Sequence, residues 1–110
     1  MASAFKSATS ASVGTSLTSV YTCPSGTTST VIGLYLCNQS GGSIEGSVEF
    51  YDASSTTHVG ILSGAPIPSG TTIVAVGGDG KIVLEAGDII KVQSNVASSI
   101  DVVLSYLEQT

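Results

Sequence analysis

The stretch SIEGSVEFY, residues 43–51, decides the fold class. Positions 44, 46, 48 and 50 hold Ile, Gly, Val and Phe, whereas the positions between them hold serine or glutamate. Successive side chains of a β-strand point to opposite faces, so this alternation predicts a strand with one buried and one solvated face.

The same kind of short apolar segment recurs on both sides of this stretch, and no segment keeps a helical period. Strands are expected at residues 16–22, 28–38, 43–51, 58–62, 71–76, 81–84, 88–94 and 100–108. About eight short strands at this spacing predict an all-β, antiparallel β-sandwich that is jelly-roll-like.

Turn residues separate these segments. Proline stands second and glycine fourth in CPSG (23–26) and IPSG (67–70), which is the preference of type I turns. The glycines at 41–42 and 77–80 are expected to form tight hairpin turns.

Two of the expected strands are apolar on both faces. In 28–38, Ile32, Leu34 and Leu36 alternate with Val31, Tyr35 and Cys37, and in 100–108 the inward series is backed by Val103 and Leu107. One face of each strand therefore needs cover beyond a two-sheet core. The residues expected at a protein interface are Phe5, Val31, Tyr35, Val103 and Leu107.

The N-terminal residues have no clear period. Residues 2–15 are mostly small and hydroxylated, with one aromatic, Phe5. Residues 1–15 are therefore predicted to form an N-terminal arm that precedes a β-sandwich domain at 16–110. The arm could be a flexible tail or an edge strand that orders only against a neighbour.

Composition argues against several kinds of partner. The chain of 110 residues carries a net charge of −5 with three Lys and no Arg, so nucleic acid and anionic membranes are not expected partners. It has no apolar run long enough to span a membrane. Charged residues make up only 10%, whereas there are 19 Ser and 12 Thr. Removing water from neutral hydroxyl groups costs less free energy than removing it from charged groups, so such a surface is suited to contact with another protein.

Residues able to support catalysis are scarce, so we expect no enzyme, no cofactor and no metal site. His58 is the only histidine, and as a strand residue it is expected to face solvent. Glu45 and Glu49 stand four apart on one strand, wider than the carboxylate pairs of glycosidases. Cys23 and Cys37 are expected to be free thiols, with a disulfide as the alternative.

Two stretches resemble a family of proteins. YTCPSGTTSTVIGLYLCN (21–38) and the region from APIPSG (65–70) through KIVLEAGDIIKVQS (81–94) are similar to small structural proteins of tailed bacteriophages, especially those infecting cyanobacteria and other aquatic bacteria. The motifs are turn and strand patterns, so no site residue carries over.

The resemblance implies a β-sandwich component of the virion, made in the host cytoplasm. The small size suggests a capsid decoration or cement protein. Its partners would be the major capsid protein or other virion subunits, and it would form a homo-oligomer. A neck, tail or fibre-attachment protein, or a module that binds host glycan, is the alternative.

Overall fold

The computed structural model describes residues 2–110 and contains nine strands. The strands are β1 (Ser3–Val13), β2 (Thr18–Thr22), β3 (Thr28–Asn38), β4 (Ile44–Asp52), β5 (Thr57–Ile67), β6 (Thr72–Val76), β7 (Ile82–Leu84), β8 (Ile89–Ser94) and β9 (Ile100–Gln109). Each strand expected from the sequence is present, and β5 continues five residues beyond its expected end at residue 62. None of the described residues belongs to a helix that could cross a membrane.

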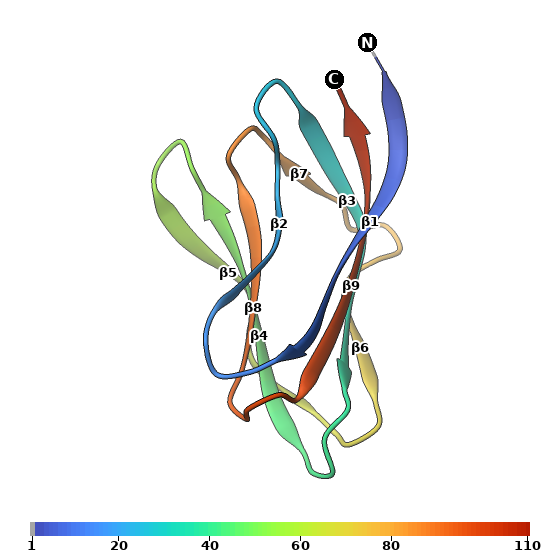
Figure 1. Cartoon of the computed structure of the whole chain (residues 1–110), viewed down its shortest axis with the longest axis vertical. Coiled ribbons are helices and arrows are strands. Elements are labelled where there is room, and N and C mark those ends of the chain that lie inside the picture. Colours follow the sequence, from blue (N-terminus) through green and yellow to red (C-terminus); the bar gives the residue numbers. More distant parts are fainter. Residues whose placement is uncertain (1) are drawn as a thin grey trace.

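The strands form two antiparallel sheets that pack face to face (Figure 1). Sheet A has the order β1-β9-β3-β6, with β7 also paired to β3, and sheet B has the order β2-β8-β4-β5. The chain crosses repeatedly between the sheets, which gives jelly-roll-like connections. The predicted fold class, an antiparallel β-sandwich, is therefore confirmed.

The core lies between the two sheets. Leu34 and Leu36 of β3 and Leu104 of β9 face Val48 of β4 and Val92 of β8, and all five are fully buried. Alternate residues along each strand supply this core, because the side-chain period of a strand is two.

Two buried polar side chains hold loops onto the core. The Asn38 amide donates to the carbonyl groups of Gly42 and Ile67, both at 2.8 Å, and its oxygen accepts from the Ser40 backbone N–H at 2.8 Å. The Asp88 carboxylate accepts hydrogen bonds from the backbone N–H groups of two other loop residues, Ala53 and Glu85. Both side chains are buried and hydrogen-bonded, as buried polar groups in folded proteins usually are.

The prediction that the two glycine segments form hairpin turns is wrong. Residues 41–42 lie where the chain leaves β3 in sheet A and enters β4 in sheet B, and residues 77–80 join β6 to β7. Both β6 and β7 run antiparallel to β3, one beyond the other, so they do not pair with each other. Turn chemistry specifies a local bend, whereas the partner of the next strand depends on contacts distant in sequence.

Residues 3–13, within the segment expected as an arm, form edge strand β1 of sheet A. Ser3 to Ser10 pair in unbroken register with Gln109 to Val102 of β9. A bulge follows, with Ser12 at a φ of 56°, and it turns the chain toward β2. Met1, the first residue of the expected arm, lies outside the described residues. That Phe5 of this segment binds another subunit stays a prediction.

Candidate interaction surface

The outer face of sheet A, which points away from sheet B, is apolar. Its large side chains come from all five strands of the sheet: Phe5, Leu107, Val103, Tyr35, Val74 and Val83. Five of them rank among the exposed large hydrophobic residues, from 38% for Tyr35 to 76% for Phe5. We call these six residues the outer apolar face.

Strand register arranges all six of these side chains in two rows. One row runs across the sheet from Phe5 through Leu107 and Thr30 to Val83, each residue paired with the next. The second row runs from Thr9 through Val103 and Tyr35 to Val74. Directly opposed residues on one face lie about 4.5–5.5 Å apart, so each row is a continuous strip.

The ring of Tyr35 closes the gap between the two rows. Gly33 pairs with Ser105 between the rows, and a β-carbon at Gly33 would lie 2.9 Å from the Tyr35 hydroxyl oxygen and 3.1 Å from a ring carbon. The hydroxyl end of the ring therefore lies over Gly33. The absence of a side chain at Gly33 is what allows Tyr35 to cover the centre of the face.

Val31 is the one expected interface residue that the structure does not place on this surface. It is fully buried in the core, because the register between β3 and β9 shifts between Val31 and Gly33. The extra residue of this bulge, Ile32, breaks the alternation, so Val31 points inward with Leu34. The other four expected residues lie on the outer apolar face, although their role in binding stays a prediction.

Sequence reasoning missed Val74 and Val83, the two exposed valines at the far edge of sheet A. They are 59% and 56% exposed, more than any other member of the face except Phe5. The apolar residues of TIVAV (72–76) indicated a strand that contains Val74, but not which face of the sheet this residue occupies. The face toward which each valine points became defined only through pairing with β3.

Charge is nearly absent from this side of the sheet. The only acidic or basic residue among the outward-facing strand positions of sheet A is Asp101, at one end of β9, where its carboxylate accepts from the Ser12 backbone N–H at 2.9 Å. Lys6 and Glu108 form an ion pair of 2.7 Å, but their register places both on the inner side of the sheet. Covering the outer apolar face would therefore desolvate almost no charge.

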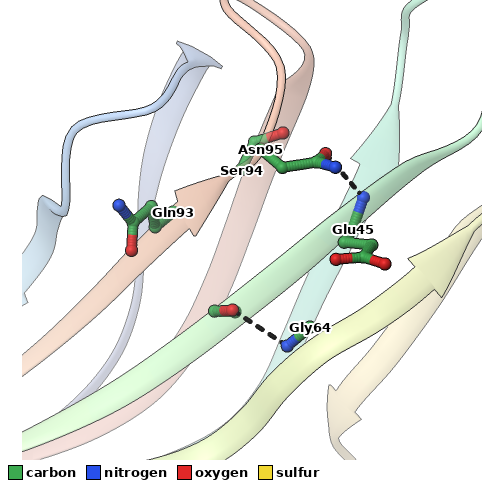
Figure 2. Close-up of a pocket in the computed structure, with 6 residues that line it drawn as sticks. Glu45, Gly64, Gln93, Ser94 and Asn95 are labelled. Atoms are coloured by element: carbon green, nitrogen blue, oxygen red, sulfur yellow. Dashed lines mark hydrogen bonds between the residues drawn. The ribbon is translucent and has the colours of Figure 1, made fainter.

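The outer face of sheet B has the opposite character. A hollow of about 240 Å³ on it is lined by Glu45, Ser47, Gly64, Gln93, Ser94 and Asn95 (Figure 2). Much of its polar lining is already engaged: the Asn95 oxygen accepts from the Glu45 backbone N–H at 2.8 Å, and the Ser47 hydroxyl accepts from the Gly64 N–H at 3.0 Å. The hollow contains no aromatic ring.

The only histidine lies farther along the same face. His58 Nδ1 is 3.1 Å from a Glu49 oxygen, its ring centroid is 4.8 Å from that of Tyr51, and Lys91 lies over the Tyr51 ring at 5.0 Å. His58 faces solvent, as expected. These contacts join β5, β4 and β8 on the surface and bring no serine or cysteine nucleophile to the histidine.

The two cysteines are free thiols, Cys23 buried and Cys37 half-buried, which confirms the first of the two alternatives. The Cys23 thiol lies within donating distance of two carbonyl oxygens, those of Thr27 (3.4 Å) and Leu84 (3.5 Å). Cys37 lies at the end of β3 beside the outer apolar face. Within residues 2–110, no three His, Cys, Asp or Glu side chains gather as a group that could hold a metal ion.

The fold, and not the sequence, is similar to that of a known protein. No family model matches the chain, and no curated protein matches it. The fold is similar to a chain in a solved structure described by the words "Bacillus endospore appendages form a novel family of disulfide-linked pili", with a TM-score of 0.45 and 17% identity over 99% of this chain and 85% of that chain. That protein is a structural component of a pilus and not of a phage. This similarity assigns no function, and membership of a phage family stays a prediction.

Proposed function

We propose that this chain is a non-enzymatic structural subunit that packs through its outer apolar face against other protein subunits. The observation that carries this proposal is the coexistence, on one sheet face, of six large apolar side chains and a single charged residue. An isolated chain leaves this surface in water, where each exposed side chain forfeits the free energy of burial.

More specifically, we propose that the chain is a capsid decoration protein of a tailed bacteriophage. The partner is the major capsid protein or another virion subunit, and the protein is located in the virion. The support is the resemblance of residues 21–38 and 65–94 to small phage structural proteins, together with a surface that is apolar and carries almost no charge.

Co-sedimentation with capsids that lack this protein tests the proposal. Val74→Asp and Val83→Asp each place a charge on the outer apolar face and should abolish attachment. Val59→Asp is the matched control, because Val59 is 51% exposed but belongs to β5 of sheet B. Circular dichroism verifies that all three variants are folded.

Unchanged attachment of both face variants would contradict the proposed docking surface. A folded wild-type protein that fails to attach to any such capsid would contradict the decoration role itself. Labelled protein found on the tail or neck would instead favour the alternative position in the virion.

A second candidate function, binding of host glycan, is favoured by the polar hollow on sheet B. The Glu45 carboxylate and the amide groups of Gln93 and Asn95 can exchange hydrogen bonds with sugar hydroxyl groups. Calorimetric titration with host-surface oligosaccharide tests it: binding lost in Glu45→Ala but kept in Val74→Asp would support this function. No heat of binding at millimolar sugar would exclude it.

A further inference from the structure

The edges of the two sheets are protected unequally. Strand β6 has five residues and β7 three, β2 has five with a register shift, and β5 has two register shifts and a proline, Pro66. Short strands, bulges and proline are the usual means of preventing another strand from adding to an edge. Among the described strands, only β1 presents a long regular edge: its eight consecutive pairs from Ser3 to Ser10 contain no bulge or proline, and its bulge lies beyond Ser10.

The hydrogen-bonding groups of this edge are defined by the pairing with β9. Ala2 and Thr110 exchange both backbone hydrogen bonds, at 3.3 and 2.9 Å. In an antiparallel pair such residues alternate, so Ala4, Lys6 and Ala8 also direct N–H and C=O toward β9. The N–H and C=O groups of Ser3, Phe5, Ser7 and Thr9 therefore point away from the sheet, where none of the described strands pairs with them.

We propose that two copies of this chain join through their β1 edges, antiparallel and about a two-fold axis at Ser7, so that their five-stranded A sheets form one continuous sheet. The pairing rests on the proposed assembly function and deepens it by naming a second copy as one partner. It uses the edge of sheet A, which meets the outer apolar face at Phe5.

The direction of the backbone hydrogen-bonding groups allows this register, and charge favours it over the register centred on Lys6. The outward-pointing groups pair when Ser7 lies opposite Ser7 of the second copy and Phe5 opposite its Thr9. Lys6, the only charged residue of β1, then lies opposite Ala8. Shifting the axis to Lys6 would place the two lysines directly opposite each other, which like charges disfavour.

The same register explains the exposure of Phe5. Its side chain is 76% exposed at the open edge of the outer face. In the dimer it would lie beside Thr9 of the second copy, an aromatic and β-branched pair of the kind that stabilises antiparallel sheets. The two outer apolar faces would then adjoin, which doubles the surface offered to a larger assembly.

Cysteine cross-linking tests the register in the full chain, with Cys37 changed to serine to remove the half-buried thiol. Opposed residues that exchange hydrogen bonds have Cα atoms about 5.5 Å apart, within the range of a disulfide. Ser7→Cys should therefore give a covalent dimer under mild oxidation. Thr9→Cys is the matched control, because the two Thr9 positions would be separated by about 13 Å along the strand.

Charge pairing gives a second test. Ser7→Lys and Ser7→Glu should each sediment as monomers, and their equimolar mixture should restore the dimer. A wild-type chain that stays monomeric at all concentrations, or equal cross-linking at positions 7 and 9, would overturn the proposed dimer. Capsid attachment is measured separately, so a monomer that still attaches would refute the dimer and leave the decoration role standing.

Discussion

The aromatic rings of Tyr21 and Tyr106 join the two sheets, with their centroids 4.1 Å apart. Tyr21 comes from β2 of sheet B and Tyr106 from β9 of sheet A. The Tyr21 hydroxyl lies 2.7 Å from the Ser29 hydroxyl and donates to a Glu108 oxygen at 3.4 Å. The two sheets are thus bridged here by a tilted pair of rings, and the Tyr21 hydroxyl keeps its hydrogen bonds.

This arrangement predicts a loss of stability at alkaline pH. Burial raises the pKa of Tyr21 from 10.0 to about 12. The folded state therefore favours the neutral phenol, and this preference has no effect on stability below pH 10. As the pH rises from 10 to about 12 the unfolded chain loses the proton first, so the free energy of unfolding falls.

Tyrosinate absorbance and denaturant titrations over this pH range provide the measurement. The fall should be smaller in Tyr21→Phe than in the wild type, whereas Tyr35→Phe on the outer face should retain it. The Glu108 hydrogen bond raises the pKa of Lys6, so part of the fall persists in Tyr21→Phe. Identical curves for Tyr21→Phe and the wild type would contradict the prediction.

The buried amide of Asn38 should tolerate no loss of its donors. Asn38→Asp replaces an amide nitrogen that donates to two carbonyl groups with an oxygen that cannot donate at neutral pH. We expect a loss of at least about 2 kcal/mol in the free energy of unfolding, because buried acceptors are left unpaired. Urea denaturation measures it.

Asn95→Asp is the control for this change. Asn95 is exposed and uses its oxygen as an acceptor, which aspartate keeps, so its stability should change by less than about 0.5 kcal/mol. Equal losses of stability in the two variants would show that burial does not determine the loss in Asn38→Asp.

The core leaves no room for a side chain at Gly46. A β-carbon there would lie 2.8 Å from Ile67 Cδ1 and 3.3 Å from Ile100 Cδ1. Gly46→Ala should therefore destabilise the protein by roughly 1–3 kcal/mol through overpacking. Thermal unfolding measures the loss, and adding Ile67→Val should recover part of it by removing the closest atom.

Gly60→Ala on the adjacent strand serves as the control, since no atom lies within 4 Å of its β-carbon position. Its effect on the unfolding temperature should be small. A comparable loss at both positions would mean that backbone freedom, and not packing, governs the response.

The two thiols should differ in reactivity. Cys37 is half-buried beside the outer apolar face, whereas Cys23 is 1% exposed. A thiol reagent should therefore modify Cys37 in the native protein and reach Cys23 only after unfolding. If the outer apolar face docks on a capsid, attachment should slow the modification of Cys37. Rapid modification of both thiols in the native state would contradict the burial of Cys23.

Much of the architecture was predictable from local pattern. The alternation in residues 43–51 predicted β4. Residues 28–38 and 100–108 are apolar on both faces, which predicted that β3 and β9 would each place apolar side chains on the outside of the sandwich. Four of the five expected interface residues lie on that face. Val31 does not, because a bulge adds one residue and reverses the direction of every side chain beyond it.

The sequence by itself determined the all-β class, the positions of the strands and the excess of apolar strand surface, because these depend on a period of two between neighbouring residues. Only the tertiary structure decided that β1 is an open edge, that Tyr35 covers Gly33, and that Val74 and Val83 extend the outer face. These features depend on which strands pair and in what register. That choice is made by contacts between residues far apart in the chain, which no local pattern contains.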